Sequence, residues 1–349
     1  MEDRNYSFID CAMDETLSKI YSSHKLSKIE KILNWERVAK VLKKADYKVE
    51  GRVGGECYTA LFMFKVMIIQ TMYSFTDRQT EEELYANIVF KRFCNVSFTS
   101  PIPDHTTICR WRERFNACDL YESIFNEALQ QIIEHGIDVT TTAIVDSTAI
   151  VSQARPKRRK EIIDAPSEST STSSNEDLNQ ASSPVKITKI DSNDPDACWS
   201  KNGQGYWFGY KTTSSCSKDG IFTTMLTTKA NLYDGHLLKE ILDKLKLAKG
   251  TEVTADKGFA SKENSDLLNS LGLIDKIMKK QTNNKLLDEA INIYNKSISQ
   301  TRFVIERAFG CLKKNLGIRR SPYLGLSKTK NYVLMGGLTN NLVRCINLL

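Results

Sequence analysis

The chain has 349 residues, of which 41% are hydrophobic and 26% charged, a globular composition with room for about two domains. Its net charge of +7 includes basic clusters at residues 155–160 and 313–320, which suit a polyanionic partner better than a general solubility surface. Nine scattered cysteines without a CxxC pair and four histidines without an HExxH motif argue against zinc sites and disulfide frameworks, so catalysis would depend on carboxylates or hydroxyls.

The N-terminus and the most apolar stretch bear on where the protein resides. Residues 1–10 are polar and acidic and cannot serve as a signal peptide. Residues 58–75 are interrupted by Lys65 and Gln70, so they predict a core helix rather than a membrane span. We therefore expect a cytoplasmic protein without a membrane partner.

The first 138 residues are expected to be helical and to form two parts. Residues 1–57 predict a helical segment whose role the sequence does not indicate, and residues 58–138 predict a small helical domain. Residues 58–73 are apolar on nearly every face, as in the central helix of a bundle. A capping box at Thr80 predicts the start of a second helix, and Asp104 predicts the start of a third.

The helix after Asp104 carries hydroxyl and guanidinium side chains beside packing aromatics. The hydroxyl and guanidinium residues are Thr106, Thr107, Arg110, Arg112 and Arg114. Short helices followed by such a helix are typical of a helix-turn-helix domain, in which this helix would enter a DNA groove and Arg110 and Arg112 would contact DNA. An amphipathic surface helix with solvated arginines explains the pattern equally well.

A single carboxylate, Asp146, lies within the apolar and β-branched stretch of residues 141–151, which predicts a buried strand. Burying an unpaired carboxylate costs several kcal/mol, so something must compensate its charge. Taken alone, Asp146 is either a structural residue that caps a turn or pairs with an arginine, or a metal ligand.

The composition changes abruptly after this strand. Residues 155–160 contain five basic residues in six, and a Ser-rich stretch of low apolar content follows. Such a segment cannot bury enough surface to offset its ordering entropy, so residues 155–189 predict a mobile insertion. Its basic start would either grip a phosphate backbone or simply be solvated.

Residues 139–349 predict a mixed α/β domain apart from this insertion. The elements are a hairpin of residues 206–217 and 221–228, helices at 237–247 and 261–271, strands at 252–255 and 273–278, and two final helices at 285–299 and 301–316. With the strand of Asp146 in front, this order is that of a ribonuclease-H-like mixed sheet with helices on both faces.

Two further carboxylates are expected near Asp146. Asp256 ends the strand that neighbours the first strand in this topology, and Glu306 is the one acidic residue in a basic helix. Taken alone, Asp256 could end a turn and Glu306 could form a surface ion pair with Arg302. Together, the three carboxylates suit hard divalent cations such as magnesium, and two such ions can promote cleavage at phosphorus.

Six motifs occur in order along the chain: PDHTTICRWR, VDSTAI, DPDACWSKNGQGYWFGYK, ANLYD, TADKGFAS and RFVIERAFGCLKK. In this order they resemble the DDE transposases of bacterial insertion sequences, most closely the insertion-sequence-five group, from about residue 58 to the C-terminus apart from the insertion. Tyr233 departs from the pattern, because family members often have histidine there.

The resemblance implies a fold, a set of residues and a set of partners. Asp146, Asp256 and Glu306 would be the catalytic triad that holds two magnesium or manganese ions, and Arg302 and Lys313 would contact transposon-end DNA. Lys211, which ends the third motif, is a further expected DNA contact. The helical N-terminal domain would recognise terminal inverted repeats in double-stranded DNA, and the protein would act as a homodimer or higher oligomer. Target DNA would be its second substrate.

Two other functions remain open from the sequence. A DNA-binding repressor derived from such an enzyme would keep the basic surfaces but would not need the acidic triad. A structure-specific nuclease with the same fold, such as a junction resolvase, would cleave DNA without joining it. Because all three carboxylates are present and a helical N-terminal domain precedes them, the sequence favours the transposase.

Overall fold

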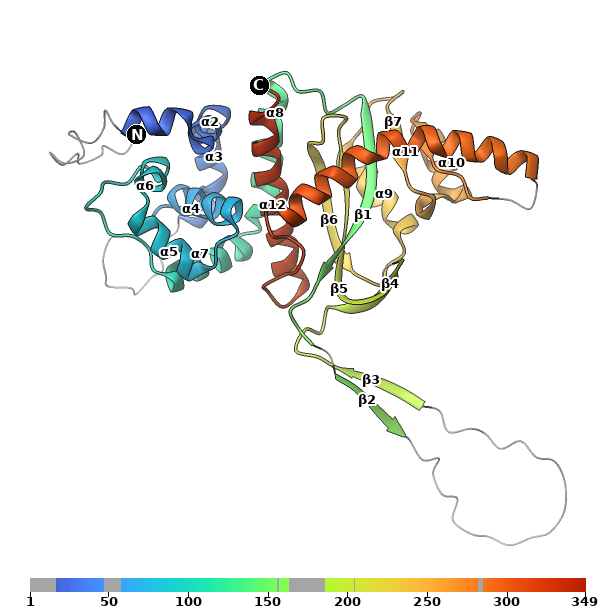
Figure 1. Cartoon of the computed structure of the whole chain (residues 1–349), viewed down its shortest axis with the longest axis horizontal. Coiled ribbons are helices and arrows are strands. Elements are labelled where there is room, and N and C mark those ends of the chain that lie inside the picture. The colour runs from blue at the N-terminus through green and yellow to red at the C-terminus, as the bar shows by residue number, and fades with distance from the viewer. Residues whose placement is uncertain (1–16, 47–57, 156, 163–185, 204, 282–284) are drawn as a thin grey trace, which may run out of the picture.

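The N-terminal part of the chain is helical, as expected. The computed structural model describes residues 17–46, 58–155, 157–162, 186–203, 205–281 and 285–349 (Figure 1). After a helical segment at residues 17–23, the elements are α2 (Lys25–Ile32), α3 (Trp35–Leu42), η1 (Lys43–Ala45), α4 (Ala60–Tyr73), α5 (Asp77–Ala86), α6 (Ile88–Cys94), α7 (His105–Ala117) and α8 (Leu120–Glu134). Within the described residues, no helix combines the length and apolarity that crossing a membrane would require.

Helix α4 is the buried centre of this bundle, and the helix after it begins earlier than predicted. Lys65 of α4 is buried and donates a hydrogen bond to the Phe93 carbonyl (2.8 Å). The capping box of α5 is formed by Thr76 and Gln79, so the prediction that Thr80 caps this helix was wrong. Thr80 lies inside α5, because the extended backbone that a capping residue needs occurs at Thr76. Helix α7 begins after Asp104, as predicted.

The second part of the chain forms a six-stranded mixed sheet. Its strands are β1 (Thr142–Val151), β4 (Cys198–Asn202), β5 (Gly205–Cys216), β6 (Phe222–Lys229), β7 (Glu252–Ala255) and β8 (Ile274–Ile277). The order is β4-β5-β1-β7-β8, and β6 also pairs with β5. Strand β1 is antiparallel to β5 and parallel to β7. The central order β6-β5-β1-β7-β8 confirms the ribonuclease-H-like arrangement, although β4 was not predicted.

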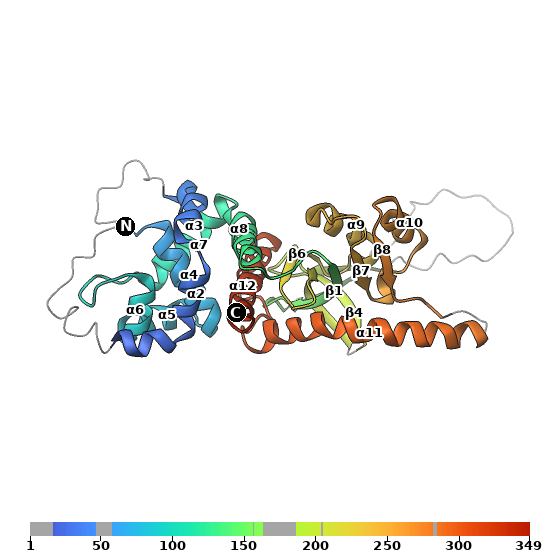
Figure 2. The ribbon, with the colours of Figure 1, turned by 90° about the horizontal axis from the view of Figure 1, so that it is seen from above.

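Helices cover both faces of the sheet. Helices α9 (Asp234–Leu245) and α10 (Lys262–Ser270), with η2 (Lys257–Phe259) between them, lie on one face, and α11 (Lys285–Lys314) crosses the other (Figure 2). Helix α11 is a single helix, so the predicted break near residue 300 was wrong. Buried isoleucines recur every seven residues at Ile291, Ile298 and Ile305, so the apolar stripe continues through residues 299–301.

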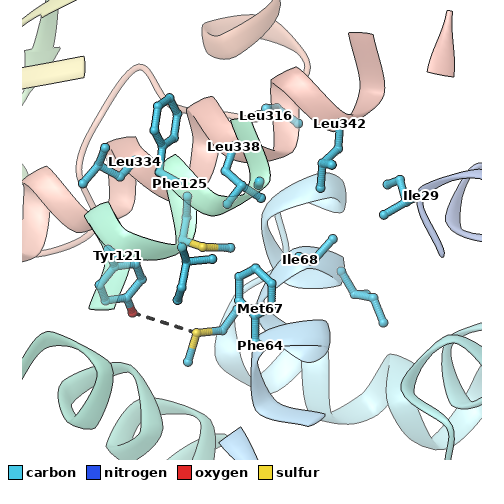
Figure 3. Close-up of a cluster of buried hydrophobic side chains, with 14 of the residues drawn as sticks. Ile29, Phe64, Met67, Ile68, Tyr121, Phe125, Leu316, Leu334, Leu338 and Leu342 are labelled. Carbon is cyan, nitrogen blue, oxygen red and sulfur yellow. Dashed lines mark hydrogen bonds between the residues drawn. The ribbon is translucent and has the colours of Figure 1, made fainter. Parts of the chain in front are cut away.

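The final helix, α12 (Leu326–Ile346), was not predicted and joins the two parts of the chain. It packs against α2, α4 and α8 of the N-terminal bundle and also against β6. Leu334, Leu338 and Leu342 of α12 lie in the same buried cluster as Phe64 and Phe125 (Figure 3). The helical part and one face of the sheet therefore share a single hydrophobic core.

The predicted insertion begins and ends in strands. Strands β2 (Lys157–Ile162) and β3 (Lys186–Asp191) pair antiparallel and project from the end of the sheet as a two-stranded ribbon (Figure 1). Backbone pairing therefore orders the flanks of a segment that was predicted to be mobile throughout. The Ser-rich stretch at residues 163–185 lies outside the described residues.

Candidate functional site

Sheet register brings two of the three predicted carboxylates together. Strands β1 and β7 run parallel with Val145 opposite Ala255, so Asp146 and Asp256 follow at adjacent positions of neighbouring strands. Asp256 stands where β7 ends and η2 begins, which places it at the carboxyl end of its strand. Neighbouring parallel strands thus present both carboxylates at one region of the sheet.

The third predicted carboxylate joins them through one guanidinium. Helix α11 crosses β1 and β7 and carries Arg302 and, one turn later, Glu306. Arg302 Nη2 lies 3.0 Å from Asp146 Oδ2 and 3.6 Å from Glu306 Oε1, and Nη1 lies 3.4 Å from Asp256 Oδ1. Residues that are 110 and 50 positions apart in the sequence therefore surround a single cation.

The packing of α11 explains why the face that carries Arg302 points at the sheet. Ile305, Phe309, Leu312 and Leu316 are all buried, as the predicted apolar stripe requires. This stripe fixes the rotation of α11 and thereby places Arg302 over the strands.

Burial decides the electrostatics of Asp146. Its side chain is 16% exposed, against 37% for Asp256 and 52% for Glu306. Burial raises the pKa of Asp146, the positive charge of Arg302 opposes this rise, and the hydrogen bond from the Ser147 N–H (2.8 Å) favours the ionised form. The charge of Asp256 raises this pKa further. The carboxylate is therefore held at a cost in free energy.

Arg302 is itself incompletely satisfied. Its side chain is 11% exposed, and its buried Nε has no hydrogen-bond partner among the described residues. A buried donor without a partner costs about 1–3 kcal/mol. The guanidinium thus occupies the acidic cluster without making the full set of hydrogen bonds that a permanent structural arginine usually makes.

The three carboxylates suit a divalent cation by their chemistry, but they lie too far apart to hold one ion. Three carboxylates are the hard oxygen ligands that magnesium and manganese prefer. Within the described part of the chain, however, no three Asp, Glu, His or Cys side chains lie close enough to hold one ion. The guanidinium of Arg302 stands between the three carboxylates, so they could converge on a metal ion only after it moves.

A polar network borders this cluster on the β5 side. Asp234, at the start of α9, accepts a hydrogen bond from Ser147 Oγ (3.0 Å) and forms an ion pair with Lys211 Nζ (2.6 Å). Ser147 Oγ also lies 2.8 Å from Thr213 Oγ1. Lys211, a predicted DNA contact, is thus held by Asp234. The motif ANLYD contains Asp234, but its sequence alone gave no sign of this contact with the residue after Asp146.

The other predicted DNA contacts differ in their surroundings. Arg110 is exposed on α7. Arg112 is only 15% exposed, pairs with Asp77, donates to Gln70 (3.1 Å) and stacks over Tyr323. It also lines a cavity of about 560 Å³ between the bundle and α12 that contains none of the three carboxylates. This placement favours a structural role for Arg112 over the predicted DNA contact.

Lys313 lies between these extremes. It is partly buried near the end of α11, where burial and the neighbouring charge of Arg319 lower its pKa.

Comparisons with known proteins show which families the chain is similar to. Residues 14–114 match the family model "Transposase domain (DUF772)", and residues 140–342 match "Transposase DDE domain". A transposase for insertion sequence element IS1106 from Neisseria meningitidis serogroup B is 29% identical over 240 residues, which are 68% of this chain and 77% of that protein. A cryo-EM structure of the piggyBac transposase synaptic complex with hairpin DNA aligns with 92% of this chain and 74% of its own, at 10% identity and a TM-score of 0.44.

Proposed function

We propose, from the premise that the chain belongs to the family of DDE transposases, that it moves an insertion sequence by recognising the terminal inverted repeats of that element. Enzymes of this family cleave and transfer DNA, and DNA is therefore the substrate.

The catalytic roles fall to Asp146, Asp256 and Glu306. One observation carries this assignment: three carboxylates from two strands and a helix all contact the same guanidinium. Two divalent ions, magnesium or manganese, would activate the attacking water or 3′-hydroxyl and stabilise the leaving oxygen when bound there. Asp146 on β1 and Asp256 directly after the neighbouring β7 would set the position of the reacting phosphate between them.

Arg302 takes two successive roles in this proposal. In the described state it is the counter-ion of the three carboxylates, and its unpartnered Nε shows that the arrangement leaves part of the guanidinium unused. With divalent ions held by Asp146, Asp256 and Glu306, the long side chain of Arg302 would be free to contact a DNA phosphate. Arginine suits that second role because its planar fork matches a phosphate group.

DNA recognition would involve both parts of the chain. Arg110 on α7 is exposed and available to a DNA groove, and Lys313 lies on the same helix as Glu306. Lys211, which pairs with Asp234 beside the carboxylate cluster, would be a further DNA contact. We leave Arg112 out of the DNA-contacting set because of its internal ion pair. Synapsis of two transposon ends would require a homodimer or higher oligomer.

The test is magnesium-dependent nicking of a duplex that carries the ends of the DNA bracketing this reading frame. Wild-type protein should nick the duplex and join the freed end to a target plasmid, and Asp256→Asn should abolish nicking while binding is retained. Asp243→Asn is the matched control, because Asp243 is an exposed carboxylate on α9.

Three other outcomes would contradict the proposal. Binding by the wild type without nicking would indicate a repressor, and nicking without joining would indicate a nuclease. Full activity of Asp256→Asn would remove the residue assignment.

A further inference from the structure

No described part of the chain covers one long face of helix α11, and this face carries exposed apolar side chains. Phe303 is 61% exposed and Ile293 is 75% exposed, although both belong to a helix whose opposite side is buried against the sheet. Large side chains of this kind are usually covered, so an exposed aromatic ring near a functional site points to a partner.

Phe303 lies directly beside the proposed catalytic residues. It follows Arg302 and precedes Glu306 by three positions, and side chains at that spacing on a helix are neighbours with about 5–6 Å between Cβ atoms. Any group that covers the Phe303 ring therefore lies next to the carboxylate cluster. Ile293 is almost three helical turns away and lacks this neighbourhood.

The rest of the face is positively charged and open. Arg307, Gly310 and Lys314 follow Phe303 at helical spacing, so the four residues form one stripe. Arg307 and Lys314 are exposed, and a Cβ added at Gly310 would meet no atom of the described residues within 4 Å. The stripe thus offers an aromatic ring, two cations and free space along the helix.

These features match unpaired DNA better than a second copy of the chain. Bases stack on exposed aromatic rings while nearby cations contact the phosphates, and this combination accepts any sequence. A protein interface on this face would have to bury Arg307 and Lys314, for which a second copy would need to supply acidic partners. Strand cleavage beside Glu306 also requires a nucleotide close to Phe303.

We infer that Phe303 is a base-stacking residue and that the stripe Phe303, Arg307, Gly310 and Lys314 is the track of an unpaired DNA strand at the cleavage point. The inference rests on the proposed function for the position of this strand. Phe303 holds the terminal nucleotide in place and does not take part in the chemistry, so it is a positioning residue.

The experiment measures binding in EDTA, so that cleavage does not contribute. The probe is a fluorescein-labelled single-stranded oligothymidylate of about 20 nucleotides. It is compared with the same oligonucleotide in which the central nucleotides lack their bases. Both probes carry the same phosphates, so the ratio of their affinities reports stacking alone. Wild type should prefer the intact probe by about five- to hundredfold, and Phe303→Ala should reduce this preference to within about twofold.

Two further variants test the mechanism. Phe303→Trp should keep the preference, and its added tryptophan fluorescence should be quenched by the intact probe but not by the abasic probe. Ile293→Ala is the matched control, an even more exposed apolar residue on the same helix, and it should behave like wild type. Because Phe303 is exposed, its replacement should leave folding unchanged.

The result that overturns the inference is an undiminished base preference in Phe303→Ala. Loss of self-association by that variant in sedimentation, with its base preference intact, would assign the face to a second copy instead. The inference and the proposed function can fail separately. Wild-type base preference without nicking would leave the inference and remove the function, whereas nicking with no base preference would do the reverse.

Discussion

Replacing Arg302 by methionine tests how the carboxylate cluster is held. Methionine keeps much of the side-chain volume but removes the cation from all three carboxylates. Removing one partner of a buried ion pair costs about 3–5 kcal/mol. Asp146 is nearly buried, whereas the more exposed Asp256 and Glu306 add at most about 1 kcal/mol each. Since the three carboxylates also repel one another, we expect the metal-free variant to lose about 3 kcal/mol of unfolding free energy.

The effect should depend on pH in a defined direction. The pKa of Asp146 is already raised by burial, and it should rise further without the opposing charge of Arg302. A carboxyl group whose pKa is raised by folding contributes stability in acid and loses this contribution as pH rises through its folded pKa. The difference in unfolding free energy between wild type and Arg302→Met should therefore be largest near neutral pH and shrink toward pH 4.

Divalent ions supply the second readout. An ion that binds only the folded state stabilises it, and in the variant no guanidinium has to be displaced. Magnesium or manganese should therefore raise the urea midpoint of Arg302→Met more than that of wild type. The matched control replaces Arg307, an exposed arginine on the same helix. Arg307→Met should change neither the free energy of unfolding nor its response to metal. Equal stability of Arg302→Met and wild type at neutral pH, with equal responses to metal, would refute the counter-ion role.

Five further substitutions probe the fold and the DNA surface. Arg112→Met should lower the urea midpoint by an amount equivalent to about 3 kcal/mol without weakening DNA binding by the folded protein, whereas Arg110→Ala should weaken DNA binding and leave stability within about 0.5 kcal/mol. Gly336→Ala should destabilise by about 1–3 kcal/mol in the same titration, because its Cβ would lie 1.8 Å from a buried isoleucine, while the open Gly310→Ala should stabilise α11 by about 0.5–1 kcal/mol. Asp104→Ala should lower the free energy of unfolding by about 1 kcal/mol through loss of the α7 cap. Hydrogen bonds from Thr107 lower the pKa of Asp104 to about 2, so thermal melts should show this cost at neutral pH and its disappearance as pH falls toward 2.

The mixed sheet and the order of its elements were predictable because local patterns encode them. The strand of Asp146 is an apolar and β-branched stretch with one carboxylate inside it, and the hairpin between β5 and β6 is marked by its Lys-Asp-Gly turn. The apolar stripe of α11 gave the buried face of that helix, and the motif order gave the family. Helix starts were less predictable: Thr76 and Thr80 both precede a suitable partner by three residues, and the extended backbone that a cap needs occurs at Thr76.

The burial and pairing of the charged side chains required the tertiary structure. From the sequence, Arg112 looks as available to DNA as Arg110, yet its partner Asp77 lies 35 residues away on another helix. The sequence likewise allowed an Arg302–Glu306 pair on one helix, and this pair is present, but the fold also turns Arg302 toward Asp146, 156 residues earlier.

The amino-acid sequence by itself determined which residues are acidic, which faces are apolar and in what order the strands follow, because these depend on neighbours within a few positions. Only the tertiary structure decided which charges meet. An ion pair depends on distance and on exclusion of water, and both are set by elements that the chain brings together from far apart.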